Sequence, residues 1–429
     1  MKQTRNKDAC FFDRERETMP WEKKRESLNR RFLEIFQRAY QRSKTYEKRF
    51  RNAGIEVRDI RSLEDVEKIP LFSTRDLVEW QRQHWPFGGI ETLDPKEFHR
   101  IYINAGLVFQ PGASWEFEDT SWAEALCAAG FRGGDRIINT FSYHLWPFAF
   151  ILDESARRIG ATVIPTGAGN TMMQVRIMQM LEINGFMGTP AFLMTLMQRA
   201  EAMGMNLERD LCLDAALVSA EMLPESLRGR LEKKLSMTIR QAYGTVLLGC
   251  IGYECGEMTG LHVPHNMLVE VIDPQTGKRV PEGAAGEIVA TNFNPSYPMI
   301  RMATGDLSIL TMEACPCGRT GPKLRRIIGR IDQAVKIRGT FVHPWQADEV
   351  MSRFPEVYKY QVVVTREDHS DVMTFFVELK EEPGRESVLK GRMERDIKDL
   401  LTVKGVVRIV PKGSIADHHQ KIEDRRRWD

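Results

Sequence analysis

Hydrophobic residues near the start of the chain recur at the spacing of an amphipathic helix. Over residues 28–54 one face is apolar and the other carries arginine and lysine. Gly54 follows the last periodic position, and glycine there commonly ends a helix. The pattern therefore predicts one long helix over residues 28–54. Its apolar face contains Phe32, Ile35, Phe36, Ala39 and Tyr40.

From about residue 136 onwards, short β-branched runs alternate with helical runs. This alternation is typical of stacked α/β layers. A methionine-rich run at residues 172–180 lies in this part, and we expect it to belong to the core rather than to a cofactor site. The predicted strands are residues 161–165, 215–219 and 238–240, and the predicted helices are residues 174–183, 192–203 and 224–235.

The pattern changes near residue 268. Residues 268–273 and 287–291 predict an antiparallel pair of strands, with a Pro-Gln-Thr-Gly turn after the first. We therefore predict an α/β protein with a large layered α/β N-terminal domain (1–331) and a small α+β C-terminal domain (332–429), joined at Asp332. The C-terminal domain is predicted to contain strands at residues 361–365, 373–379 and 406–410 and a helix at residues 386–401.

Composition and charge exclude several classes of protein. Of the 429 residues, 42% are hydrophobic and 28% are charged, as in soluble globular proteins. The formal net charge of +2 and the short basic runs do not predict a nucleic-acid partner. No run reaches the roughly 18 apolar residues of a membrane span, and the first 25 residues lack the apolar core of a secretory signal. Seven cysteines do not form a disulfide framework in a chain of this size, so we expect a cytoplasmic protein.

Several short motifs lie close together between residues 298 and 346. Thr304-Gly305-Asp306 follows an apolar run and is predicted to form a tight turn. Gly329-Arg330 and a Lys-Ile-Arg-Gly segment that ends at Gly339 follow it. Together these motifs resemble the nucleotide-binding and hinge segments of the phenylacetate–CoA ligase branch of the adenylate-forming (AMP-binding) superfamily. The resemblance implies an AMP-forming ligase that activates a carboxylic acid as its acyl-adenylate and transfers it to the thiol of CoA.

The resemblance also implies roles for residues in and around these motifs. Asp306 would accept hydrogen bonds from the ribose hydroxyls, and Arg330 would hold the ribose or the α-phosphate, although a salt bridge between domains is an alternative for Arg330. Asp332 matches the residue about which the C-terminal domain turns. Arg338 and Gly339 match the loop that lines the CoA tunnel, where glycine lets the pantetheine pass close to the main chain.

Two further segments complete the implied nucleotide site. Tyr243 and Gly244 match the segment beside the adenine. Lys421 matches the lysine that stabilises the transition state of adenylation, because a cation there offsets the charge shared by the carboxylate and the α-phosphate. A solvent-exposed lysine in the tail is the alternative for Lys421.

An aromatic segment at residues 141–146 matches the wall of the acid pocket in the family. Tyr143 and His144 are its candidate substrate contacts, and Ala220 and Glu221 would complete the pocket. Aromatic walls beside small residues suit a flat aryl acid or a short apolar acid. An ordinary core or loop role is the alternative for Tyr143 and His144.

The segments that should handle ATP depart from the family pattern. In the phosphate loop, residues 104–111, Phe109 replaces a glycine and Gln110 replaces the lysine that would offset phosphate charge. Val246 and Leu247 replace the hydroxyl and carboxylate residues after the tyrosine, and an aliphatic side chain cannot ligate magnesium. Two hypotheses therefore stand: a ligase with an atypical ATP site, or a divergent relative that binds acyl-AMP or acyl-CoA as a transferase or regulatory pseudoenzyme.

Four residues form a Cys₃His set that is typical of structural zinc, namely Cys255, His262, Cys315 and Cys317. The two pairs are far apart in sequence, and the resemblance strengthens the zinc interpretation because relatives share the arrangement. Reduced buried cysteines beside a core histidine are the alternative. The thiol that accepts the acyl group would belong to CoA or to a carrier protein, and homodimers are common among relatives.

Overall fold

The structure is a computed structural model that describes residues 10–104, 107–113, 118–331, 335–337, 340–342, 344–367, 370–381, 386–401 and 403–426. The chain divides into two compact units. The first contains Met1–Thr304 and Ser308–Arg326, and the second contains Gly305–Leu307 and Ile327–Asp429. The predicted joint, Asp332, lies outside the described residues.

The first unit begins with helices. The predicted helix over residues 28–54 is in fact two helices, because Ser43 has an extended backbone and its side chain accepts a hydrogen bond from the Tyr46 N–H. A serine in this geometry caps the second helix. These elements are α1 (Arg14–Glu17), α2 (Trp21–Arg42), α3 (Lys44–Asn52) and α4 (Thr74–Gln83), with short 3₁₀ turns η1 (Val57–Asp59), η2 (Leu63–Lys68) and η3 (Pro95–Glu97).

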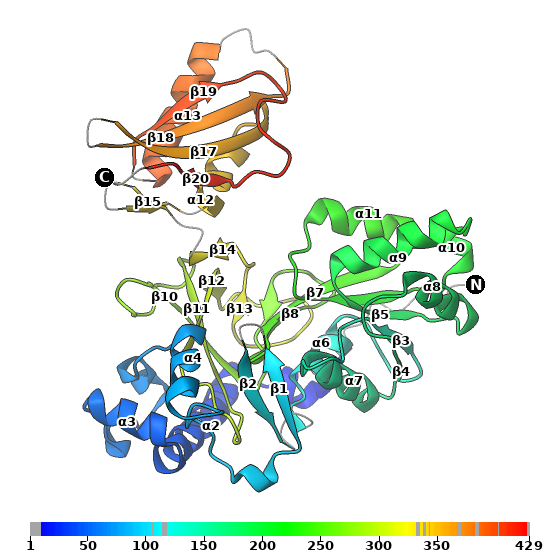
Figure 1. Cartoon of the computed structure of the whole chain (residues 1–429), viewed down its shortest axis with the longest axis vertical. Coiled ribbons are helices and arrows are strands. Elements are labelled where there is room, and N and C mark those ends of the chain that lie inside the picture. The colour runs from blue at the N-terminus through cyan, green and yellow to red at the C-terminus, as the bar shows by residue number, and fades with distance from the viewer. Residues whose placement is uncertain are drawn as a thin grey trace. The chain divides into compact units, whose positions relative to one another are not determined.

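A long mixed sheet crosses the first unit (Figure 1). In the described residues its strand order is β10-β11-β12-β13-β9-β8-β7-β6-β5-β3-β4, and β14 pairs with β12. The parallel part is β3 (Arg136–Asn139), β4 (Thr162–Pro165), β5 (Gly185–Gly188), β6 (Ala215–Val218) and β7 (Thr238–Thr245). The remainder is β8 (Gly249–Glu254), β9 (Leu261–His262), β10 (Met267–Ile272), β11 (Ala285–Asn292), β12 (Met302–Thr311), β13 (Lys323–Leu324) and β14 (Gly329–Arg330).

Helices cover both faces of the parallel strands, as the alternating pattern predicts. Met187 and Leu217 pack with residues of α6 (Ser121–Ala128) and α7 (Phe148–Arg158). Phe186 and Val218, the neighbours of those two residues, pack with the helices of the other face. Those helices are α8 (Thr171–Met180), α9 (Pro190–Ala202), α10 (Leu207–Asp210) and α11 (Glu225–Leu235). Successive strand residues therefore enter opposite cores, which gives three layers.

The second unit has its own core and a smaller sheet. Its four strands have the order β19-β18-β17-β20, and a separate hairpin joins β15 to β16. Two helices pack on this sheet around buried residues such as Phe375 and Ile397. The elements are β15 (Val335–Ile337), β16 (Thr340–Val342), α12 (Pro344–Ser352), β17 (Val357–Glu367), β18 (Ser370–Leu379), α13 (Glu386–Leu401), β19 (Gly405–Ile409) and β20 (Ile422–Asp424).

Two further local predictions were wrong. The Thr304-Gly305-Asp306 segment lies inside the ten-residue strand β12 instead of in a tight turn. The methionine-rich helix α8 buries Met178, but Met172, Met173 and Met180 are exposed, so the helix contributes only one methionine to the core. The layered α/β N-terminal part and the small C-terminal domain are confirmed.

Candidate functional site

The candidate ribose ligand and the candidate phosphate ligand form an ion pair. Asp306 on β12 lies opposite Arg330 on β14 in an antiparallel register, and Arg330 Nη1 donates to Asp306 Oδ1 over 3.0 Å. The Asp306 side chain is 15% exposed and that of Arg330 is 49% exposed. A carboxylate and a guanidinium side by side can bind hydroxyl donors and a phosphate oxygen, respectively. The pair therefore has the chemistry that a nucleotide monophosphate requires.

Gly305 makes room for this pair. Its φ is +78°, in the left-handed region that favours glycine, although it lies within a strand. A Cβ atom at Gly305 would lie 3.0 Å from Arg330 Nη2. The main chain at Gly305 thus lies directly against the Arg330 guanidinium. A larger residue at position 305 would displace that guanidinium.

The candidate adenine segment lies at the end of β7. The ladder between β7 and β8 is irregular between Tyr243 and Gly244, and a Cβ at Gly244 would lie 2.3 Å from the Gly249 carbonyl oxygen. Leu247, at the position where the family has the magnesium-binding carboxylate, is buried and its carbonyl accepts from the Asn292 side chain. Leu247 therefore packs in the interior instead of offering an oxygen ligand.

The segment that was matched to the phosphate loop, residues 104–111, belongs to a two-stranded hairpin. Its strands are β1 (Arg100–Asn104) and β2 (Val108–Gly112), paired from Arg100–Gly112 to Asn104–Val108. Within it, the buried Gln110 accepts a hydrogen bond from the Asn104 side chain over 3.2 Å. Gln110 is thus engaged inside the hairpin, and residues 105 and 106 lie outside the described part of the chain.

A glutamine from α4 binds both main-chain groups of Phe109. Gln81 Oε1 accepts from the Phe109 N–H over 3.0 Å, and Gln81 Nε2 donates to the Phe109 carbonyl over 2.6 Å. Gln81 also donates to the Tyr297 hydroxyl, and Trp85 contacts the Phe109 ring edge-on at 4.7 Å. The main-chain N–H of Phe109 is therefore already used and does not contribute to a phosphate-binding nest. No local sequence signal pointed to Gln81, because its partner is 28 residues away.

Tyr143 and His144 occupy different environments in the candidate acid wall. The Tyr143 hydroxyl donates to Asp153 over 3.1 Å and accepts from Asn139 over 2.9 Å. Burial, followed by the nearby Asp153 carboxylate, raises the pKa of Tyr143 above its ordinary value, so its hydroxyl stays protonated. His144 is exposed. The wall also meets the hairpin, since the Ile103 N–H donates to the Leu145 carbonyl.

Ala220 and Glu221 follow the carboxyl end of β6. Ala220 has a φ of +68°, which is uncommon for a residue with a Cβ. Glu221 is exposed and accepts from the Ala191 N–H at the start of α9 over 3.3 Å. Ligands of open α/β sheets bind outside the carboxyl ends of parallel strands. These two residues therefore lie at the edge where a substrate pocket is expected.

Lys421 is held within the second unit by Asp348 of α12. Its Nζ forms an ion pair with Asp348 Oδ1, and the Tyr360 hydroxyl donates to the same oxygen over 2.5 Å. The Lys421 ammonium also lies 5.9 Å from the centroid of the Tyr360 ring. Sequence analysis did not identify Asp348, which precedes Lys421 by 73 positions. Asp332, Arg338 and Gly339 lie outside the described residues.

Cys255, His262, Cys315 and Cys317 come together in the first unit. All four are buried, and their ligand atoms lie within 4.8 Å of one another. The Cys255 and Cys315 sulfurs are 3.7 Å apart, and the Cys317 sulfur is 3.5 Å from His262 Nε2. Around one tetrahedral zinc ion, bond lengths of about 2.3 Å (S) and 2.0 Å (N) give separations of about 3.8 and 3.5 Å. The donor set and its spacing therefore fit zinc.

Hydrogen-bond donors surround the sulfurs of this cluster. Thr259 Oγ1 donates to Cys315 over 3.2 Å, and the Arg319 N–H donates to Cys317 over 3.5 Å. Hydrogen bonding from Cys255, followed by that from His262, lowers the pKa of Cys317 well below its ordinary value. Thiolates bind metal and thiols do not. The surroundings thus favour the thiolate at Cys317, whereas the contact with Cys317 raises the pKa of Cys255.

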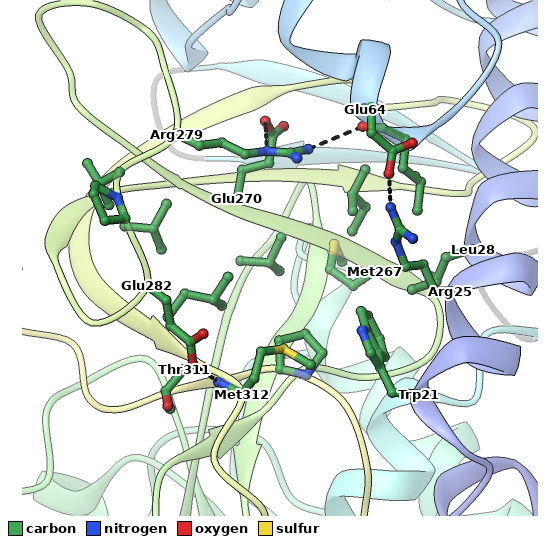
Figure 2. A pocket seen from close by; sticks show the side chains of 18 residues that line it. Trp21, Arg25, Leu28, Glu64, Met267, Glu270, Arg279, Glu282, Thr311 and Met312 are labelled. Carbon is green, nitrogen blue, oxygen red and sulfur yellow. Dashed lines mark hydrogen bonds and ion pairs between the residues drawn. The ribbon is translucent and has the colours of Figure 1, made fainter.

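A separate apolar cavity of about 240 Å³ lies in the first unit between α2 and the β10–β12 part of the sheet (Figure 2). Trp21, Leu28 and Met267 line it, and it includes none of the candidate site residues. Its arginines are ion-paired: Arg25 binds Glu64, and Arg279 binds Glu270 over 3.2 Å, while Glu282 accepts a hydrogen bond from the Met312 N–H. In the described part of the chain, no helix is both long and apolar enough to cross a membrane.

Comparison with known proteins gives the family. Models of the AMP-binding enzyme and of the AMP-binding enzyme C-terminal domain match residues 122–294 and 339–426. The chain is 32% identical to phenylacetate-coenzyme A ligase of Thermus thermophilus, over 94% of this chain and 96% of that protein. It is 28% identical to phenylacetate-coenzyme A ligase of Escherichia coli, over 88% of each chain.

A solved structure of 2-hydroxyisobutyryl-CoA ligase, in an open conformation with 2-HIB-AMP and CoA, superposes with a TM-score of 0.82. Its identity to this chain is 25%, and the match covers 95% of this chain and 93% of that chain. The similarity extends over both units, and the matched proteins share one reaction class. The chain therefore belongs to the phenylacetate–CoA ligase family of adenylate-forming enzymes, the AMP-forming acid–thiol ligases.

Proposed function

We propose that this protein activates an aryl or short acyl carboxylate as an acyl-adenylate and transfers the acyl group to CoA in the cytoplasm. The observation that carries the proposal is the Asp306–Arg330 pair, in which two groups suited to ribose and phosphate lie 3.0 Å apart on paired strands. In this proposal Asp306 accepts from the ribose hydroxyls and Arg330 donates to the α-phosphate. Tyr243 and Gly244 border the adenine.

Acid activation requires an attack of the carboxylate on the α-phosphorus, with pyrophosphate as the leaving group. Negative charge is then shared by carboxylate and phosphate oxygens, and a fixed cation there stabilises the transition state. We assign that cation to Lys421. To reach the reacting groups, Lys421 would break its ion pair with Asp348. Tyr143, His144, Ala220 and Glu221 are the proposed acid-binding residues, and Asp332, Arg338 and Gly339 are the proposed hinge and CoA-tunnel residues.

The Cys255, His262, Cys315 and Cys317 cluster is proposed to hold one structural zinc ion. A closed set of four protein ligands leaves no open position for catalysis. Zinc there would tie β9 and the loop after β8 to residues 315–317, which are distant in sequence.

The experiment that tests the ligase proposal measures pyrophosphate released from ATP with a panel of aryl and short acyl acids. Acid-dependent release followed by CoA thioester formation is expected, and Lys421→Ala should abolish both. The control is Lys412→Ala, an exposed lysine in the same C-terminal segment. Sedimentation of the same protein tests a homodimer, and replacement of CoA by a carrier-protein thiol tests the acceptor.

The second candidate function is a relative that binds acyl-AMP or acyl-CoA and does not adenylate. The hydrogen bonds of Gln81 to Phe109 and of Asn104 to Gln110 favour it, because they use groups that would otherwise face the outer phosphates. Leu247 also offers magnesium no oxygen ligand. Thermal stabilisation by AMP, with no added effect of magnesium and ATP, would support this function over the ligase.

A further inference from the structure

A small cavity next to the apolar cavity of Figure 2 has a different electrostatic character. Its volume is about 100 Å³, and it lies between α2, the segment before β10, and residues 320–322. The two cavities share the wall residues Trp21, Leu28, Met267 and Pro322. The charged groups that line the small cavity are all basic: Arg16, Lys24 and Arg31, with His265 beside them.

Among the residues that the structure describes, two of these cations donate hydrogen bonds to main-chain oxygens only, and the Arg31 guanidinium also lies 4.8 Å from the centroid of the Phe293 ring. Lys24 Nζ donates to the carbonyl oxygens of Glu17 and Thr320, each over 2.9 Å. Arg31 Nη1 donates to the His265 carbonyl over 3.2 Å. Burial lowers the pKa of both Lys24 and Arg31, and the nearby carboxylates (Glu124 and Glu17 for Lys24, Asp119 for Arg31) offset only part of the lost hydration.

Arg16 adds a third donor. Its Nη2 pairs with Asp13 over 3.1 Å, but its buried Nε atom has no hydrogen-bond partner in the described part of the chain. Arg16 Nη1 lies 3.0 Å from His265 Nε2, and arginine can only donate, so Nε2 is the acceptor in this contact. The other ring nitrogen of His265, Nδ1, contacts the Glu124 carboxylate.

The nearby carboxylates are already engaged by other groups. Glu17 binds Arg319 over 2.7 Å, and Glu124 binds His265 and the Tyr253 hydroxyl. Asp119 accepts from Asn266 over 2.7 Å. Thus the described lining of the cavity contains three cationic side chains and no carboxylate, in contrast to the paired arginines of the neighbouring cavity.

We propose that this small cavity binds a short organic carboxylate, distinct from the acid that is activated. Lys24 and Arg31 would hold the carboxylate, and the buried Arg16 N–H would supply a further donor. The remaining walls, formed by Met19, Trp21, Leu28 and Val263, suit an apolar body rather than an inorganic ion. A cavity of about 150 Å³ holds benzene, so the smaller volume here suits about three to five carbon atoms.

Isobutyrate is a suitable probe, and titration calorimetry on the full chain measures its binding. Isobutyramide has the same shape without the charge, and it should bind at least tenfold more weakly because hydrogen bonds to charged groups are the stronger ones. Inorganic phosphate tests whether any anion suffices. Binding of phosphate as tight as that of isobutyrate would overturn the assignment to an organic carboxylate.

The variants separate this cavity from the candidate acid pocket. Arg31→Gln and Lys24→Gln should each weaken isobutyrate at least tenfold, whereas the exposed neighbours on the same helix, Arg30→Gln and Lys23→Gln, should leave binding unchanged. Ser27→Leu places a larger side chain on the cavity wall without removing a cation, so it should also abolish isobutyrate binding. This variant tests the proposal even if the variants that remove a cation do not fold.

Isobutyrate bound only as a substrate in the acid pocket would respond to neither Arg31→Gln nor Ser27→Leu. That result, or the absence of any binding to the unaltered chain, would overturn the proposal. The outcome is independent of the ligase assay, because Lys421→Ala should keep the small-cavity binding even when it abolishes adenylation.

Discussion

Replacing Asp348 by asparagine should free Lys421 with only a small energetic effect. The two side chains are 45% and 47% exposed, and ion pairs of this exposure contribute about 0.2–1 kcal/mol. An energy of about 1 kcal/mol corresponds to a factor of about five in population. Asp348 therefore holds Lys421 weakly enough for a substrate to displace it, while the Tyr360 hydroxyl can still donate to the asparagine oxygen.

Steady-state release of pyrophosphate measures the consequence. Asp348→Asn should raise kcat by at most about fivefold and make it less sensitive to salt, because salt screens the exposed pair in the unaltered protein. Lys421→Ala should lower kcat by about 100-fold or more, the cost of removing one preorganised group that stabilises transition-state charge. Glu349→Gln, an exposed neighbour on α12, is the matched control and should change neither quantity.

A loss of about 100-fold in Asp348→Asn would refute this reasoning, since it would place Asp348 in the chemistry itself. Undiminished activity in Lys421→Ala would refute the role of Lys421. A fivefold effect in Glu349→Gln would show that α12 tolerates no charge change and that the Asp348 result has another cause.

Three further predictions concern metal, stability and pH. Metal analysis of the purified chain should find one zinc per molecule. Cys317→Ser should lose the zinc and lower the Tm measured by calorimetry, whereas the control Cys212→Ser should retain the zinc. Glu270→Gln should lower the free energy of unfolding in urea by about 3–5 kcal/mol, because it leaves the guanidinium of Arg301 buried without its bidentate partner. The control is Glu47→Gln, which removes a half-exposed ion pair with Arg51 and should change that free energy by less than about 1 kcal/mol. A change that small in Glu270→Gln would contradict the prediction. Although desolvation opposes it, hydrogen bonding from the Ile415 N–H lowers the pKa of Glu378 below its usual 4.5. The stabilisation by ionised Glu378 is therefore complete above pH 4.5 and is lost as the pH falls through the lower pKa of the folded state. The difference in the free energy of unfolding between the unaltered chain and Glu378→Gln should therefore shrink in acid. A difference that stays constant with pH would exclude ionised Glu378 as its cause.

The layered fold could be predicted because periodicity reports burial directly. Strand β5 (Gly185–Gly188) was nevertheless missed, because Phe186 and Met187 are both apolar and enter opposite cores, so its sequence shows no alternation. The helix break at Ser43 was missed because the apolar spacing continues through it, while the backbone is set by one capping side chain. Gly305 was placed in a turn because Thr-Gly-Asp is common in turns, whereas pairing with β14 holds it in a strand.

The candidate site was less accessible to sequence analysis than the fold. Motif spacing identified Asp306 and Arg330, but their ion pair depends on strand register, which no local pattern specifies. Gln81 and Asp348 could not be found, because each acts on a partner through tertiary contact alone. Two of the cations that line the small cavity, Lys24 and Arg31, are ordinary members of the charged face of α2, and only packing distinguishes them from their exposed neighbours.

Single-turnover incubation with radiolabelled ATP, magnesium and an aryl acid tests the central claim most directly, because it detects the acyl-adenylate itself. We predict an acid-dependent labelled acyl-AMP that forms in the unaltered chain, fails to form in Lys421→Ala, and disappears when CoA is added. ATP left intact with every acid, in a protein that still binds AMP, would contradict the assignment of adenylation to this chain.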